Sequence, residues 1–163
     1  MNDEKGQLSG EYMLLVGSLI VVLMISIFMI ANENELNIAM AAAKSGADEG
    51  VASSSSAIYP KETFNEYDDM EGLKHPYSVS IVNVSYNSSG IDENYGKQKI
   101  QFKVYAKASA DYNKKELDSI GDRINYNLRK SVAMSFNTAD STNKLYNPVF
   151  SNNYVFTTAN VVW

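Results

Sequence analysis

The sequence predicts an α+β fold, in which a long apolar N-terminal helix precedes a small antiparallel sheet with one packed helix. Three observations carry this prediction. No charged residue interrupts the stretch Tyr12–Ala31, a helical apolar spacing continues beyond it, and two strand-like runs precede one amphipathic helical run. The 163 residues suit one domain plus a membrane segment rather than two full domains.

Composition narrows the classes of function. The formal charge of −5 predicts no nucleic-acid partner, since no basic stripe is available to neutralise phosphates. The chain has no cysteine and one histidine, so neither disulfides nor thiolate or paired-histidine metal sites are expected. We expect His75 to be a loop or strand-edge residue and the acidic stretch Lys61–Lys74 to be solvated rather than a calcium site. With no catalytic or cofactor motif, we expect a protein that is not an enzyme and holds no cofactor.

The apolar stretch Tyr12–Ala31 has the length of a membrane span. Its 20 residues, at about 1.5 Å each, cover the roughly 30 Å of a hydrocarbon core as a helix. A cleaved secretory signal does not fit, because the run is too long and its start is not basic. A single-pass anchor and a helix processed ahead of its apolar run both remain. Lys5 before the run and Glu33 and Glu35 after it favour a cytoplasmic N-terminus.

The residues Lys5-Gly6-Gln7-Leu8-Ser9-Gly10-Glu11-Tyr12 separate these two alternatives. The segment resembles the class III signal peptide of archaeal type IV pilins, in which a basic residue and Gly precede a Gln-x-Ser-x-Glu start. The resemblance implies that a prepilin peptidase cuts between Gly6 and Gln7, removing residues 1–6. It also implies a pilin-like fold and a mature chain that leaves the membrane and polymerises with copies of itself.

Glu11 is the residue with a specific role in this scheme, because burying an unpaired carboxylate is costly. By the resemblance, Glu11 pairs with the new amine of Gln7 on a neighbouring subunit and sets the axial register. If Gln7 cyclises instead, Glu11 needs a hydroxyl such as that of Ser9 of a neighbour, or is neutral. A carboxylate at headgroup level with no assembly role is the simpler alternative. The filament-core contacts are assigned to Leu8, Tyr12, Leu14, Leu15, Gly17, Ile20, Leu23 and Ile27.

A helical pattern continues past the apolar run. Its apolar positions recur at three- and four-residue steps, so the helix is predicted to run from about Leu8 to about Ser56. The positions are Leu36, Met40, Ala43, Ala47 and Val51. Gly46 and Gly50 are expected to soften or bend it. The predicted organisation is therefore a leader (1–6), a long helix (7–57) and an external head domain (58–163).

Within the head, Tyr77–Tyr86 and Gln98–Ala108 are strand-like and predict an antiparallel hairpin. The connection Asn87–Lys97 contains two turn signals, Ser89-Gly90 and Tyr95-Gly96. Further strands are expected at Tyr154–Trp163 and, shorter, within Leu145–Phe150. The strand order is left open.

A helix is predicted between these strands. Asn113 and Glu116 have the spacing of a capping box, and the helix is expected to run to about Met134 and to lie on the sheet. Its apolar stripe consists of Leu117, Ile120, Ile124, Leu128 and Val132.

Asn83 and Asn87 each begin an N-x-S sequon, and in an exported chain both are candidate sites for an N-linked glycan. The resulting hypothesis is a structural subunit of an archaeal type IV pilus-like filament for surface or cell–cell adhesion. It is inserted in the membrane as a precursor and then extracellular. Two alternatives remain: a minor pilin or pseudopilin-like component, and a single-pass anchored surface binding protein.

Overall fold

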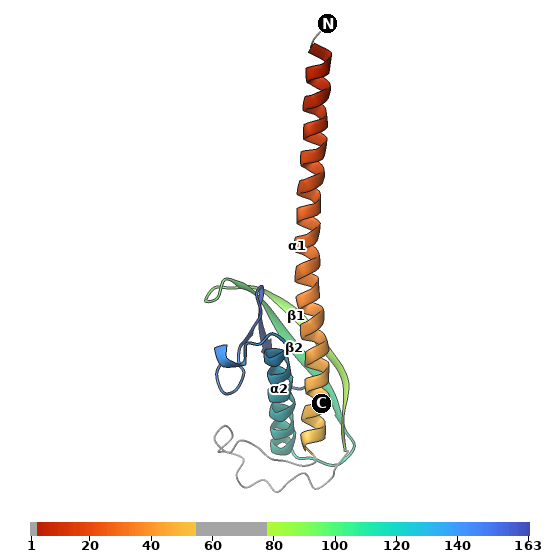
Figure 1. Cartoon of the computed structure of the whole chain (residues 1–163). Helices are drawn as coiled ribbons and strands as arrows, with labels where there is room; N and C mark the ends of the chain where they lie inside the picture. Colours follow the sequence, from red (N-terminus) through yellow and green to blue (C-terminus); the bar gives the residue numbers. More distant parts are fainter. Residues whose placement is uncertain (1–2, 55–77) are drawn as a thin grey trace. The chain divides into compact units, whose positions relative to one another are not determined.

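The computed structural model describes residues 3–54 and 78–163, with only the backbone for residues 3–9 and 53–54. The chain divides into two compact units, Met1–Leu36 and Asn37–Trp163, each of which is described by itself. A single long helix, α1 (Asp3–Ser54), contributes to both. The predicted layout of a long apolar helix, a small four-stranded sheet and a second helix is confirmed (Figure 1).

Helix α1 begins five residues earlier than the expected start at Leu8. At its other end α1 stops at Ser54. The rest of the serine run and Pro60, which were expected to end the helix, lie outside the described residues.

The sheet of the second unit has the strand order β1-β2-β4-β3. Strands β1 (Val79–Asp92) and β2 (Lys97–Ala108) pair antiparallel, as predicted for the hairpin. Strand β4 (Tyr154–Thr158) joins β2 in parallel, and β3 (Val149–Phe150) pairs antiparallel with β4. The parallel pair corrects the expectation of a purely antiparallel sheet. Its cause is the intervening helix, which carries the chain back so that β4 runs in the direction of β2.

The β1–β2 hairpin is longer than predicted. Strand β1 continues through Asn87, which was expected at the turn, and ends at Asp92. The turn itself contains Tyr95-Gly96, with Gly96 at a φ of 63°. Ser89-Gly90 lies instead at a register shift between Ser88 and Ile91, and Gly90 has a φ of 82°. The Ser89-Gly90 signal is therefore a β-bulge, a place where a left-handed glycine is common.

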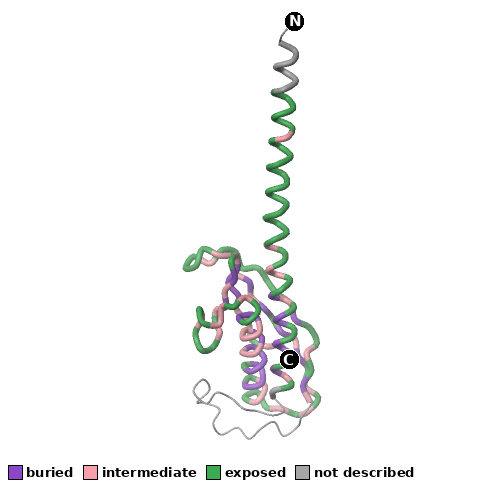
Figure 2. Tube along the Cα trace, in the orientation of Figure 1, coloured by how far each residue is buried: buried purple, intermediate pink, exposed green. Residues whose placement is uncertain are grey.

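Helix α2 (Lys114–Ser135) begins with the predicted capping box. Asn113 Oδ1 accepts from the backbone N–H of Glu116 at 2.9 Å, and Glu116 Oε2 accepts from that of Asn113 at 2.8 Å. Four of the five predicted stripe residues are buried and Leu117 is half-buried. They face the alternate residues of β2 and β4 that form the core: Ile100, Phe102, Val104, Ala106 and Phe156. The burial colours follow this pattern along α2 (Figure 2).

The segment after β4 stays beside β2, so the predicted strand Tyr154–Trp163 is largely correct. Val162 donates its N–H to the carbonyl of Val104 at 2.9 Å and accepts from the N–H of Ala106 at 2.8 Å. Helix α2 holds this segment too, because the side-chain amide of Asn125 donates to the carbonyl of Ala159 at 2.9 Å. Only Val149–Phe150 of the expected strand within Leu145–Phe150 is extended enough to pair.

Candidate functional site

The segment that resembles a pilin leader, Lys5–Tyr12, lies in the first turns of α1. The Gly6–Gln7 bond is therefore helical in the uncleaved chain. Gln7 and Glu11 are four residues apart on this helix and share one face. The Glu11 side chain is exposed, whereas the side chains of Gln7, Leu8 and Ser9 lie outside the described part. The cleavage at Gly6 and the pairing of Gln7 with Glu11 stay predictions.

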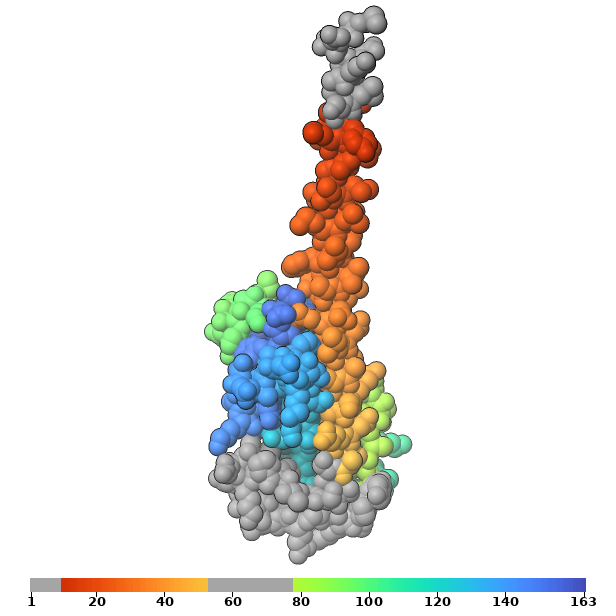
Figure 3. Space-filling view, in the orientation of Figure 1, coloured from red at the N-terminus to blue at the C-terminus, as the bar shows by residue number. Residues whose placement is uncertain are grey.

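The apolar run of α1 is exposed on every face of the helix. Seven of the residues predicted as filament-core contacts lie from Tyr12 onward. Six of them are large, and their exposed fractions range from 51% to 76%: Tyr12, Leu14, Leu15, Ile20, Leu23 and Ile27. Figure 2 shows this run in the colour of exposed residues, and in Figure 3 its side chains stand out from the helix on the side in view. A helix that is apolar all round needs apolar surroundings all round, unlike an amphipathic helix on a protein surface.

The few polar groups in the run are satisfied within the helix. Ser18 Oγ donates to the carbonyl of Leu15 at 2.8 Å and Ser26 Oγ to that of Val22 at 2.9 Å. Neither hydroxyl requires water, so both are compatible with lipid. By length and composition, α1 is the one helix among the described residues that is long and apolar enough to cross a membrane. Gly17, the remaining predicted core residue, has open space at the position that a β-carbon would take.

Gly46 and Gly50 have a different environment from Gly17. Both lie in the part of α1 that belongs to the second unit, and both face the backbone of α2. A β-carbon at Gly50 would lie 2.7 Å from Ile124 Cα. The expectation that these glycines soften or bend the helix stays a prediction, and the structure gives them a further role: they allow two helices to approach closely. Their four-residue spacing, next to the buried small residues Ala39, Ala42, Ala43 and Ala47, is the sequence signal for such a contact.

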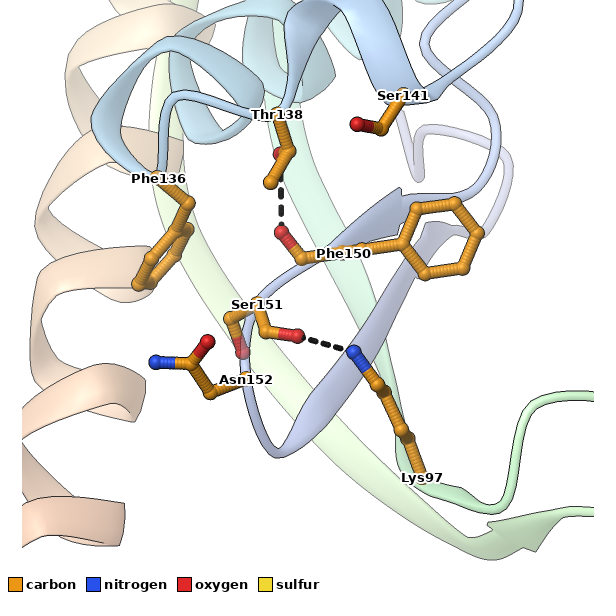
Figure 4. Close-up of a pocket in the computed structure, with 7 residues that line it drawn as sticks. All are labelled: Lys97, Phe136, Thr138, Ser141, Phe150, Ser151 and Asn152. Carbon is orange, nitrogen blue, oxygen red and sulfur yellow. Dashed lines mark hydrogen bonds between the residues drawn. The ribbon is translucent and has the colours of Figure 1, made fainter.

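A pocket of about 340 Å³ opens where α2 ends and β3 turns toward β4. Figure 4 shows Lys97 and Thr138 directed at neighbouring carbonyl groups where β3 ends. Lys97 Nζ donates to the carbonyl of Ser151 at 2.6 Å, and Thr138 Oγ1 donates to the carbonyl of Phe150 at 3.0 Å. Both polar groups hold the backbone of the β3–β4 turn, which gives these two side chains a structural role.

Two sequence expectations about ligands fall on residues 55–77. His75 and the acidic stretch Lys61–Lys74 lie outside the described residues. Within residues 3–54 and 78–163, no three carboxylate, histidine or cysteine side chains lie together in a way that suits a metal ion.

The two sequons lie on β1. Asn83 is directly opposite Tyr105 of β2, and Asn87 is opposite Gln101. Both asparagines are exposed, so both are accessible to a modifying enzyme. Their occupancy by a glycan stays a prediction.

Comparisons with models of protein families, with curated proteins and with solved structures found no match for this chain. What the chain does is therefore inferred from its own residues and geometry.

Proposed function

We propose that this chain is a structural subunit of an archaeal type IV pilus-like surface filament, assembled by bundling of its apolar N-terminal helices. The observation that carries the proposal is the exposure of apolar side chains on every face of α1 between Glu11 and Glu33. This segment is joined to an α+β unit with a buried core of its own. In this proposal, cleavage within the Lys5–Tyr12 motif allows the chain to pass from the membrane into the filament.

The energetics favour two successive apolar environments for this helix. Moving a large aliphatic side chain out of water is worth roughly 1.5–3 kcal/mol, so a run of this length is strongly disfavoured in water. Lipid covers the apolar surface of the helix before assembly, and neighbouring helices cover it in the filament. The exchange of lipid for helices gains little from hydrophobicity, because lipid tails are as apolar as leucine. The register must then come from directional groups, and Glu11 is the charged side chain positioned for that role.

A single-pass anchored binding protein would use the same helix without polymerising. It would keep residues 1–6 and have no need of Glu11. A minor pilin would be processed identically and differ only in its abundance within a filament. Processing separates the first alternative from our proposal, and stoichiometry separates the second.

The direct test is peptide mass spectrometry of filaments sheared from cells that express the chain. We expect the filaments to contain this chain as their main protein, with Gln7, free or cyclised, as its first residue. The variant Gly6→Leu, which changes the residue before the expected cut, should keep its leader and stay in the membrane. Recovery of the wild-type chain only from the membrane fraction, with residues 1–6 attached, would refute the proposal.

A further inference from the structure

Lysines gather on the outer face of the sheet. Strand β2 alternates between core residues and residues on the opposite face, and Lys103, Tyr105 and Lys107 follow one another on that opposite face. Lys103 and Lys107 are exposed and Tyr105 is half-buried. These three residues are referred to below as the basic strip.

The residues directly across β1 from the basic strip are polar and contain hydrogen-bonding groups, whereas Val162, on the other side of Tyr105, is apolar. On β1, Ser80 lies opposite Lys107, Asn83 opposite Tyr105, and Ser85 opposite Lys103. None of these three described neighbours is acidic. The carboxylate that does pair with a β2 lysine belongs to Asp92, at the hairpin end of the strand, where it lies 3.7 Å from Lys99 Nζ. Neither Lys103 nor Lys107 is neutralised by a residue directly across β1.

The basic strip is positively charged, whereas the whole chain has a net charge of −5. Tyr105 also orients Lys103, whose Nζ lies 5.3 Å from the centroid of the ring. At about 3.3 Å per strand residue, Lys103 and Lys107 are roughly 13 Å apart along β2. The strip is therefore a row of widely spaced cations with hydroxyl, amide and aromatic groups between them.

We propose that the basic strip binds a linear acidic polysaccharide. Serine hydroxyls and the Asn83 amide suit the hydroxyl groups of sugars, the lysines suit carboxylates, and Tyr105 offers a ring edge for apolar contact. A nucleic-acid strand places a phosphate about every 3.4 Å, a density that two lysines about 13 Å apart do not match. A polymer with sparse anions fits this spacing better.

The described helical surfaces of a second copy fit the strip less well. The exposed surfaces of α1 and α2 in the second unit carry both signs close together, such as Lys44 with Asp48 and Lys115 with Asp118. These mixed surfaces do not present a continuous acidic face to the lysines. Among the described residues, charge complementarity therefore favours an external polyanion over the helical surfaces of a second copy at this face.

The inference rests on the proposed function, because one strip with two exposed lysines binds weakly. Display of many strips along one filament lets a polymer engage several at once, and such multivalency raises overall binding by about 10²–10⁴-fold without new contacts. The strip would then supply the adhesive surface of the filament.

The test compares filaments of the wild type, of Lys103→Glu/Lys107→Glu, and of Lys114→Glu/Lys115→Glu, which makes the same charge change at the start of α2. Binding is measured to immobilised hyaluronate, which has one carboxylate per disaccharide, with dextran, double-stranded DNA and vesicles containing anionic lipid as the other arms. We expect selective, salt-sensitive binding to hyaluronate that falls by about tenfold or more in the strip variant and by less than about threefold in the α2 variant. Circular dichroism of the variants controls for folding.

Several outcomes would overturn the inference. Equal losses in the two variants would show a general charge effect, and preferential binding to DNA or to vesicles would assign the strip to another partner. Loss of filament assembly only in the strip variant would assign it to contacts between copies. If the wild type forms no filaments, the proposed function fails on its own. The strip is then judged by the same comparison on the full chain in neutral-lipid vesicles, where equal binding by wild type and strip variant refutes it.

Discussion

A β-carbon added to Gly46 of α1 would lie 2.6 Å from the backbone carbonyl oxygen of Asn127 in α2. The backbone of α1 at Gly46 is thus in close contact with α2, mainly with its backbone. Leu128 Cα and Ser131 Cβ lie within 2.8 Å of the same position, so an added methyl group would collide with several atoms of α2. Close approach of this kind positions the second half of α1 in the core of its unit.

The variant Gly46→Ala is therefore expected to destabilise the second unit. Overpacking costs about 1–3 kcal/mol, partly offset by a gain of up to about 1 kcal/mol in helix propensity. Urea unfolding of the detergent-solubilised chain, followed by tryptophan fluorescence, measures the difference. Gly17→Ala is the matched control, because Gly17 has open space around it, and it should not destabilise the chain. An equal stability for Gly46→Ala and the wild type would mean that the two helices do not pack this closely.

The capping box at the start of α2 gives a second stability prediction. Asn113→Ala removes the side-chain acceptor for the Glu116 N–H and should lower the free energy of unfolding by about 1 kcal/mol. Asn113→Ser keeps an acceptor at the same position and should stay within a few tenths of a kcal/mol of the wild type. Equal losses in the alanine and serine variants would contradict the capping role.

Tyr126 predicts a dependence of stability on alkaline pH. Burial, followed by the neighbouring Tyr146, raises the pKa of its phenol above the ordinary value of 10.0. Between pH 10 and the higher folded-state pKa, the unfolded chain loses this proton while the folded chain keeps it. The stabilising contribution is thus complete below pH 10 and is lost as pH rises through the folded-state pKa.

The variant Tyr126→Phe should reduce the fall in stability above pH 10. Unfolding midpoints measured from pH 8 to 11 give the slope of stability against pH. Tyr86→Phe is the control, because it removes one phenol that is exposed. The same slope in Tyr126→Phe and the wild type would exclude Tyr126 as a source of the decline.

Glu11 gives the prediction most specific to assembly. Glu11→Gln keeps the size of the side chain and removes its charge, so filaments should be lost or sharply reduced while the chain still accumulates in the membrane. Glu33→Gln makes the same change at the other end of the apolar run and should leave assembly intact. Immunoblots of the membrane and sheared fractions separate synthesis from assembly. Normal filaments in Glu11→Gln would show that the charge of Glu11 does not set the axial register of the subunits.

Local patterns predict the individual elements well. The alternation of Ile100, Phe102 and Val104 places β2 correctly, because one face of the strand is buried and the other is not. The four-residue spacing from Ile120 to Val132 does the same for α2. Both signals are residue patterns within one segment, so they can be recognised in a single sequence.

The features that the sequence does not reveal depend on contacts between distant segments. The parallel pairing of Tyr154 with Gln98 joins residues far apart in the chain, and no local pattern specifies the direction of such a pair. Gly46 on its own indicates a flexible point, because nothing within α1 identifies Asn127 as its neighbour. Gly90 indicates a turn just as well as a bulge, because both favour glycine with a positive φ.

The position of β4 has a consequence for the order of events during biosynthesis. Strand β4 is made after α2, yet it inserts beside β2 and separates it from β3. The nascent chain therefore holds β2 with one unpaired edge until residues 154–158 leave the ribosome, whereas the apolar part of α1 emerges more than a hundred residues earlier. If the proposed membrane insertion takes place during synthesis, it begins while the sheet is still incomplete, and a chaperone that protects an open strand edge would act in that interval.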